Sequence, residues 1–370
     1  MDLLTAAHAC FPRDYAESRR HFLAAARRRG AALRSYPNPN RGPHGEALAT
    51  DCAWLGPKQA KRVLVLMSGT HGVEGFCGAG ALMDVLTTPP ALPRGMGLLL
   101  IHAINPFGFA WIRRVTEEGV DLNRNFVDFA KPPANPGYDA LADAILPAKI
   151  TGPAYERAQK KLRAYIAKHG MPAFNAAMSG GQYRHPKGLF YGGTAPTWSH
   201  RTQAAIIADY GLKRRRRIAV LDYHTGLGPH GYGDLLCAHM PETKSAALSR
   251  KLYGDNLSEP FGGKTNAGQP APGARHGFAS VLWERALGGK VSFVGVEYGT
   301  YHGLEVVRPA LIADHWLHAQ GPVRWNAPLT RRIKAKLRKA FYPDTDSWRE
   351  AVLWRSRQSI RLAAEGLAKA

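Results

Sequence analysis

Two residues with the chemistry of metal ligands follow a strongly apolar run. The run RVLVLMSG (62–69) leads into a glycine-rich turn that holds His71 and, three positions later, Glu74. Side chains three apart on a helical turn point the same way, so both can reach one ion. A catalytic zinc site uses three nitrogen or oxygen ligands from the protein and leaves a fourth position open. Alone, such a pair is also common in a core or on a surface, so a third ligand must come from elsewhere.

His224 and Glu297 stand at the ends of two further apolar runs. His224 closes the run in LDYHTGLG (221–228), and Glu297 closes the run in VSFVGVEYGT (291–300). A lone histidine there can also be an ordinary core residue, but a matched His/Glu pair at an equivalent strand end favours a third metal ligand. A carboxylate at the end of a buried strand is costly unless a metal, a cation or a mechanism uses it. Glu297 therefore fits a general base.

A polar segment between these runs carries three arginines. In NPFGFAWIRRVTEEGVDLNRNF (105–126), Arg113, Arg114 and Arg124 with Asn123 can form a site for a carboxylate or an oxyanion. Guanidinium groups suit this task because they donate two parallel hydrogen bonds to an anion. The alternative is a polar surface loop.

The sequence segments that must position these residues are predicted to form an α/β fold. The runs at 62–69, 97–106, 218–225 and 291–299 are typical of strands buried on both faces, and helices are expected between them. Strand, helix and strand in succession indicate a parallel unit, and ligands collect at the carboxyl ends of such strands. We therefore expect a mixed, mostly parallel sheet flanked by helices in three layers.

One catalytic domain is expected to span residues 1–370. It would begin with a helix and hairpin over about 1–58 and end in a helical portion from about 304 to 370. An insertion at about 131–196 would carry loops over the site and one helix around 155–169. The residues that select the substrate are expected in the loops at 131–196 and 254–275. The sequence contains no internal repeat and no long low-complexity linker.

Composition narrows the class of protein. The 370 residues are 45% hydrophobic, which fits a globular enzyme. The four cysteines are scattered, so reduced thiols in a cytoplasmic protein are expected, and neither a signal sequence nor a membrane span is indicated. The net charge of +22 favours an acidic small substrate. Nucleic-acid binding is disfavoured because the basic run at 213–217 lacks interleaved aromatic residues and is typical of a solvated surface.

Five motifs in order resemble one family. SGTHGVEG, NPFGF, GVDLNRNF, DYHTG and VEYGT, spread over about residues 60–300, resemble the zinc carboxypeptidase superfamily, which includes the succinylglutamate desuccinylase and aspartoacylase branch. The wording of the motifs looks closest to a bacterial carboxypeptidase-like group whose substrates are undefined. Their agreement in order and position makes the resemblance specific.

The resemblance implies a role for each motif residue. It implies that His71, Glu74 and His224 bind one zinc ion per chain. Glu297 would activate the attacking water and protonate the leaving nitrogen, and Asp121 would orient the first histidine. Asn123 and Arg124 would grip a terminal carboxylate. The arginine that polarises the scissile carbonyl maps onto Arg113 and Arg114, of which Arg114 is favoured.

The sequence departs from the digestive carboxypeptidases in one respect. Those enzymes carry a tyrosine on a mobile loop upstream of the catalytic glutamate, but no tyrosine lies between Tyr253 and Tyr298. Tyr298 and Tyr301 are the candidates to replace it, although both follow Glu297. A metallocarboxypeptidase acting on small peptides is expected, with an N-acyl-amino-acid deacylase as the alternative. An inactive binding protein is less favoured, because all four central residues are present.

Overall fold

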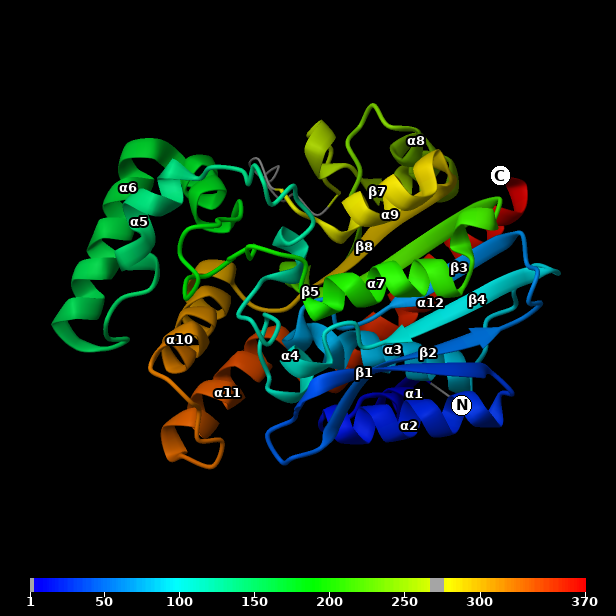
Figure 1. Cartoon of the computed structure of the whole chain (residues 1–370), viewed down its shortest axis with the longest axis horizontal. Helices are drawn as coiled ribbons and strands as arrows, with labels where there is room; N and C mark the ends of the chain where they lie inside the picture. The colour runs from blue at the N-terminus through cyan, green and yellow to red at the C-terminus, as the bar shows by residue number, and fades with distance from the viewer. Residues whose placement is uncertain (1–2, 267–275) are drawn as a thin grey trace.

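Eight strands form one mixed sheet whose centre consists of the apolar runs described above (Figure 1). The computed structural model describes residues 3–266 and 276–370, so the end of the expected specificity loop at 254–275 lies outside the described residues. The strands are β1 (Ala32–Arg41), β2 (Ala47–Leu55), β3 (Arg62–Met67), β4 (Met96–His102), β5 (Arg217–His230), β6 (Gly233–Cys237), β7 (Leu257–Ser258) and β8 (Val291–Gly299).

The strand order is β1-β2-β4-β3-β5-β8-β6-β7. The four central strands β4, β3, β5 and β8 run parallel to one another. Antiparallel pairing adds β2 and β1 on one side and β6 on the other, and the two-residue β7 runs parallel to β6. The predicted mixed, mostly parallel sheet is confirmed.

Strand β3 shows why the central strands are apolar throughout. Its side chains alternate between two separate cores: Leu64 and Leu66 belong to one, and Val63, Val65 and Met67 belong to the other. Successive side chains of a strand point to opposite faces, so a strand covered on both faces needs an unbroken apolar run.

Helices cover both faces of the sheet. Their bounds are α1 (Leu3–Cys10), α2 (Tyr15–Arg28), α3 (Gly75–Thr87), α4 (Pro106–Ala110), α5 (Pro136–Ile145), α6 (Gly152–Ser179), α7 (Trp198–Asp209), α8 (Lys244–Tyr253), α9 (Ala279–Leu287), α10 (Arg308–Ala319), α11 (Pro328–Phe341) and α12 (Asp346–Lys369). Helices α2, α3, α8 and α12 pack on one face, and α7 and α9 pack on the other. Of the helices in the described part of the chain, none combines the length and apolar character that crossing a membrane requires.

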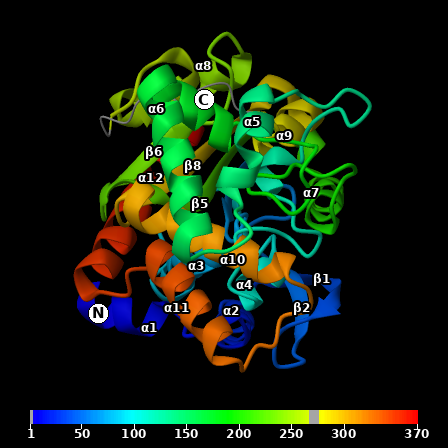
Figure 2. The ribbon, with the colours of Figure 1, turned by 90° about the vertical axis from the view of Figure 1, so that its left-hand side faces the viewer.

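A third core lies at one end of the molecule, where α5, α6, α10 and α11 pack together (Figure 2). The region 131–196, expected to carry loops, contains the helical hairpin α5–α6. Helix α6 is longer than the helix expected around 155–169, and it bends at Gly170, whose φ is 81°. Gly170 tolerates this backbone conformation, and Pro172 then has no amide proton to donate across the bend.

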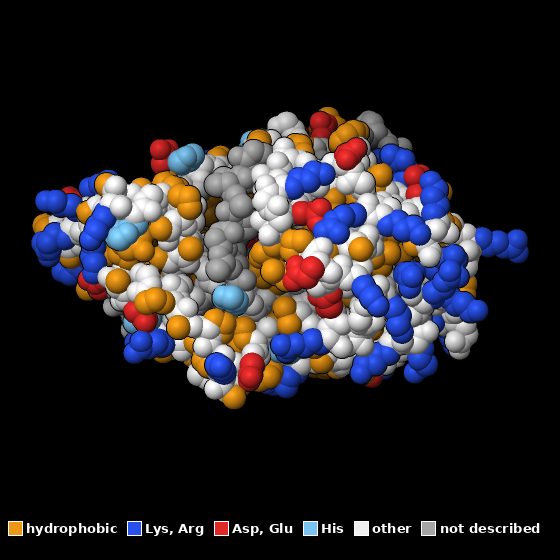
Figure 3. All heavy atoms as spheres, turned by 90° about the horizontal axis from the view of Figure 1, so that it is seen from above, with side chains coloured by type: hydrophobic (Ala, Val, Ile, Leu, Met, Phe, Trp, Pro, Cys, Tyr) orange, Lys and Arg blue, Asp and Glu red, His pale blue; other side chains and the backbone are white. Residues whose placement is uncertain are grey.

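The surface is strongly basic away from the middle of the molecule. Seen from above, Lys and Arg side chains gather at the two ends, over α5 and α6 and on the side of the C-terminus, while apolar side chains border the middle (Figure 3). Some arginine side chains are held in place by hydrogen bonds to backbone carbonyls. In the basic run, Arg215 donates to the carbonyls of Lys58, Ala60 and Tyr210 and lies over the ring of Trp54. All four cysteines are buried and free.

Candidate metal centre and active site

His71 and Glu74 lie on the single helical turn that links β3 to α3, the short 3-10 segment Gly72–Glu74. Both side chains are buried, and His71 Nδ1 lies 2.9 Å from Glu74 Oε1. The turn can fit here because Gly72 has no side chain: a Cβ atom at this position would lie 2.0 Å from the carbonyl carbon of Gly108 in α4. The backbone of α4 therefore presses directly on the turn that carries the two candidate ligands.

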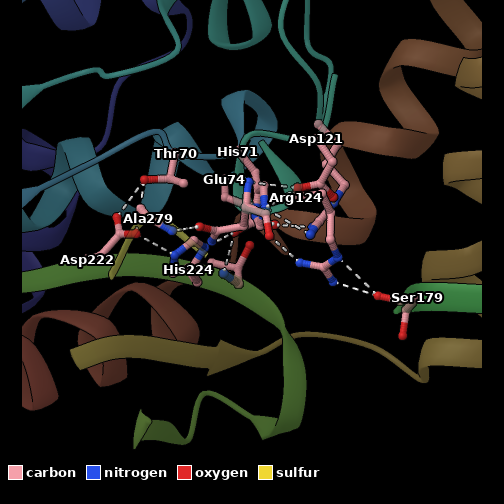
Figure 4. Close-up of polar contacts among 12 residues, drawn as sticks. Thr70, His71, Glu74, Asp121, Arg124, Ser179, Asp222, His224 and Ala279 are labelled. Atoms are coloured by element: carbon pink, nitrogen blue, oxygen red, sulfur yellow. Dashed lines mark hydrogen bonds and ion pairs between the residues drawn. The ribbon is translucent and has the colours of Figure 1, made fainter. Parts of the chain in front are cut away.

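His224 reaches the same point from strand β5 (Figure 4). Its Nδ1 lies 2.9 Å from Glu74 Oε2, which also accepts a hydrogen bond from the backbone nitrogen of Thr225 at 3.2 Å. One ligand atom from each of His71, Glu74 and His224 lies within 4.8 Å of the other two. Among the described residues, this is the group of His, Cys, Asp and Glu side chains close enough to share a metal ion.

The Nε2 atom of each histidine faces the carboxylate of an aspartate. His224 Nε2 lies 2.7 Å from Asp222, whose carboxylate also accepts from the Thr70 hydroxyl at 2.8 and 3.0 Å. His71 Nε2 lies 3.3 Å from Asp121. Metal-binding histidines usually donate their second N–H to such a carboxylate, which leaves the first nitrogen free for the metal. Sequence reasoning missed Asp222, although its spacing of two from His224 on a strand places both side chains on one face.

The donor set fits a zinc ion. With Nε2 protonated and donating to a carboxylate, the Nδ1 lone pairs of His71 and His224 both face the Glu74 carboxylate. The contact of 2.9 Å between Arg114 Nη2 and His71 Nε2 requires the opposite tautomer of His71, so that contact and the Asp121 hydrogen bond are alternatives. Two imidazoles and one carboxylate are the ligands of several catalytic zinc sites.

Charge distribution favours an ionised Glu74. Burial opposes its ionisation. When the two imidazoles are protonated on Nδ1, however, the charge of His71, the hydrogen bonds from both rings and the charge of Arg114 outweigh burial and hold the pKa of Glu74 well below the usual value. Glu74 is therefore an anion in the folded protein, as a metal ligand must be.

Glu297 lies on β8 and lines the same cavity as the three candidate ligands. Its Oε1 accepts a hydrogen bond of 3.1 Å from the backbone nitrogen of Leu227. Burial, together with the negative charge of Glu74, raises the pKa of Glu297 to about 7, although both histidines and Arg114 oppose the shift. A carboxylate with a pKa near neutrality can both accept and return a proton, which suits general acid and base chemistry.

The two adjacent arginines have different surroundings. Arg114 lines the cavity, where it donates to Asp121 and Glu74 at 2.9 Å each and lies over the ring of Phe190. Arg113 points away from the cavity and donates to the buried carboxylate of Asp314 at 3.3 Å. Of the pair, Arg114 is the one that faces the candidate metal ligands.

Arg124 is a buried cation held by neutral groups. Its guanidinium donates to the backbone carbonyls of Asn123 and Ser179 and lies against the rings of Phe190 and Phe278. Desolvation lowers the pKa of Arg124. Asn123 Oδ1 accepts from the backbone nitrogen of Ala279, so its side chain is anchored to the start of α9. Both residues line the cavity.

The cavity has a volume of about 520 Å³. The three candidate metal ligands and Glu297 line it, as do Met171, Phe174 and Met178 of α6, which form one wall. This wall comes from the region 131–196, where specificity loops were predicted, but it is formed by helix α6 rather than by a loop. No tyrosine lines the cavity among the described residues. Tyr298 is fully buried and donates to the carbonyl of Val352, so it faces the core.

Comparison with solved structures identifies the fold as that of the zinc carboxypeptidases. The chain is similar to the carboxypeptidase A from Helicoverpa armigera, with a TM-score of 0.53 and 13% sequence identity over 96% of this chain and 74% of the other. Bovine thrombin-activatable fibrinolysis inhibitor, in complex with tick carboxypeptidase inhibitor, gives a TM-score of 0.46 and 13% identity over 96% and 98%. The family resemblance predicted from the motifs is thus confirmed for the fold.

No curated protein matches the sequence significantly. One family model does match, over residues 11–355, and it is described as "Protein of unknown function (DUF2817)". Because this match spans most of the 370 residues, the chain belongs to the DUF2817 family.

Proposed function

We propose that the chain is a zinc-dependent hydrolase that cleaves an amide bond next to a free carboxylate, with one zinc ion per chain. The observation that carries the proposal is the convergence of His71, Glu74 and His224 on one point of a cavity that Glu297 also lines. The carboxypeptidase fold is consistent with this chemistry, and small peptides are the proposed substrates.

His71, Glu74 and His224 would hold the ion, and Asp121 and Asp222 would fix the two imidazoles. A bound zinc ion supplies a Lewis acid that polarises a carbonyl and makes water more acidic. Glu297 removes a proton from the attacking water and returns it to the leaving nitrogen. Arg114 faces the negative charge that develops on the carbonyl oxygen, and its hydrogen bonds to Asp121 hold it in place.

Arg124, with Asn123, is proposed to bind the free carboxylate of the substrate. A buried guanidinium whose hydrogen bonds go to neutral carbonyls is attractive to an anion, because the low dielectric of the site strengthens the pairing. Arg113 is left out of this proposal because its guanidinium pairs with Asp314 outside the cavity.

An N-acyl-amino-acid deacylase is the second candidate. The observation that favours it is the lack of a tyrosine among the described residues that line the cavity. The acylase branch that the motifs resemble does not require the tyrosine of the digestive carboxypeptidases. Both candidates use the same zinc ligands, the same Glu297 and the same carboxylate-binding residues.

The deciding experiment compares the zinc-loaded wild type with Glu297→Gln on a panel of short peptides and N-acyl amino acids, with products identified by mass spectrometry. Loss of the general base should lower turnover by about 10²–10⁴-fold. Bound zinc, measured by atomic absorption, should stay at one ion per chain, because Glu297 is not a proposed ligand. Released C-terminal amino acids would indicate a peptidase, and released acyl groups would indicate a deacylase.

Glu305→Gln provides the matched control, since Glu305 is exposed and lies outside the cavity lining. It should behave as the wild type in both activity and zinc content. Full activity in Glu297→Gln would contradict the assigned role of Glu297. Zinc binding that survives loss of both histidines would contradict the proposed metal centre.

A further inference from the structure

A second arginine without an acidic partner faces the same cavity. Arg308 begins α10, directly after the single turn of π-helix formed by Gly303–Val307, and it lines the cavity together with the candidate metal ligands. Turns of π-helix are rare and often occur at functional sites. Arg308 plays no part in the chemistry proposed above.

Two nitrogens of the Arg308 guanidinium, Nε and Nη1, are buried and have no hydrogen-bond partner among the described residues. No described carboxylate forms an ion pair with Arg308. The neighbouring cavity arginine behaves differently: Arg114 is paired with Asp121 and Glu74. Leaving a buried donor without a partner is unfavourable, and more so when the donor is charged, so an acceptor bound against this guanidinium would relieve that cost.

The surroundings of Arg308 are apolar. Its guanidinium lies 5.4 Å from the ring centre of Phe174 on α6, and Leu304, Val307 and Leu311 line the cavity around it. Tyr155 is the titratable group that interacts with it electrostatically, and burial lowers the pKa of Arg308. Because arginine remains charged throughout the usual pH range, this wall presents a fixed positive charge in a low dielectric.

Arg308 and Arg124, the residue proposed to bind the carboxylate, contact helix α6 at two different places. Arg308 lies over Phe174, whereas Arg124 donates to the carbonyl of Ser179. These two contact points are five residues apart, or about 7.5 Å along the helix axis. Both arginines line one cavity of about 520 Å³, so a substrate that fills this cavity is able to contact both.

We propose that Arg308 binds a second anionic group of the substrate, in addition to the carboxylate held by Arg124. The substrate class is then a small amide with two negative charges, such as a peptide or N-acyl amino acid with an acidic side chain beside the scissile bond. This inference rests on the proposed function for the identity of the substrate. The observation that Nε and Nη1 of Arg308 have no hydrogen-bond partner among the described residues does not depend on that function.

The kinetic test uses matched substrates that differ only in charge. Glu and Gln, and separately Asp and Asn, are placed on either side of the scissile bond, and kcat/KM is measured for the zinc-loaded wild type, Arg308→Met and Arg308→Lys. Methionine keeps an apolar stem over Phe174 but removes the charge. We expect the wild type to prefer an acidic member by about 10- to 100-fold, the usual range for a hydrogen bond to a charged group. Arg308→Met should lose that preference while its rate on the neutral member stays near the wild-type value.

Arg331→Met is the control, because Arg331 is exposed on α11 and lies outside the cavity lining. It should keep the wild-type preference, and Arg308→Lys should keep part of it. An acid-to-neutral ratio that is the same in the wild type and Arg308→Met would overturn the inference while leaving the hydrolase intact.

A binding measurement separates this inference from the proposed hydrolase. The same acidic and neutral compounds are titrated by calorimetry into zinc-loaded Glu297→Gln protein, with and without Arg308→Met. Tighter binding of an acidic member that depends on Arg308 would support the second anion site even if the panel contains no substrate. Equal binding of both members in both proteins would reject it.

Discussion

Asp222 shows how a residue that touches no substrate can govern the proposed metal centre. Its carboxylate accepts from His224 Nε2 at 2.7 Å and from the Thr70 hydroxyl, and it is fully buried. These contacts select the tautomer of His224 that presents Nδ1 to the other two ligands.

Asp222→Asn should weaken zinc binding by about 10- to 100-fold, the usual effect of removing such a partner. The amide cannot accept a hydrogen bond at both positions as a carboxylate does, so the orientation of His224 becomes less defined. Zinc affinity can be measured by competition with a chelator. Asp209→Asn is the control, because Asp209 pairs with Arg34 and Tyr36 away from the site. An unchanged zinc affinity in Asp222→Asn would contradict the assigned role.

At the scale of elements, a buried charge network behind the site ties helices α10 and α11 to the turn that carries His71 and Glu74. Asp314 of α10 accepts from Arg113 at 3.3 Å and from Lys334 of α11 at 2.6 Å, and all three side chains are buried. The backbone of Arg113 also accepts a hydrogen bond from the backbone nitrogen of Val73 in that turn. Lys334 also donates to the carbonyl of Ile112, which has the left-handed φ of 47°.

Asp314→Asn should lower the free energy of unfolding by about 3–5 kcal/mol, because it leaves two buried cations without a counter-charge. Urea denaturation would measure the loss. Adding Lys334→Met to this variant should recover part of the stability, since it removes one of the unpaired charges. Asp346→Asn, at an exposed position, should change little. A loss below about 1 kcal/mol in Asp314→Asn would mean that the network is not a stabilising element.

The central strands were predictable because each is buried on both faces and therefore reads as an unbroken apolar run. Strand β6 was missed, since its five residues GDLLC begin with a glycine and an aspartate and lie in a turn-rich region. Of the hairpin α5–α6, helix α5 was not predicted, and α6 was predicted only around 155–169, because Gly170 and Pro172 interrupt its helical pattern. Long helices can accommodate such a bend when tertiary packing holds both halves.

The candidate site was predictable as far as its residues stand next to apolar runs of the sequence. His71 and Glu74 follow such a run, His224 and Glu297 come at the end of two others, and the structure brings all four to one cavity. Arg308 could not be found in this way, because nothing in its local sequence tells which arginine of a basic chain lacks a partner. The difference between Arg113 and Arg114 also could not be predicted, because it depends on Asp314, which lies 201 positions after Arg113 and pairs with Arg113 alone of the two.

At the scale of the whole molecule, the net charge of +22 has to be accommodated by the fold. Several arginines are neutralised by carboxylates, such as Arg19 by Asp51 and Arg357 by Asp84. Others, including Arg215, bind backbone carbonyls and keep their full charge. The remaining excess repels itself across the surface, and dissolved salt screens such repulsion over distances of about 10 Å.

Thermal stability should therefore rise as sodium chloride is added from about 0.02 to 0.3 M, over which screening increases strongly. The double variant Lys213→Glu and Arg216→Glu lowers the net charge from +22 to +18 and should show a smaller salt effect. Melting curves recorded by circular dichroism would measure both, with an expected shift of a few degrees per kcal/mol. A larger salt effect in the double variant would contradict repulsion as the cause.

The two edges of the sheet have a bearing on self-association. An edge strand with free backbone groups can pair with another copy of itself and seed β-aggregates. Here β7 offers only two residues, and β1 contains Pro37 and Pro39, which have no amide proton to donate. Arg34 and Arg41 add like charges along β1, so two copies would repel one another edge to edge. The sheet is thus protected at both edges from growing into a fibril.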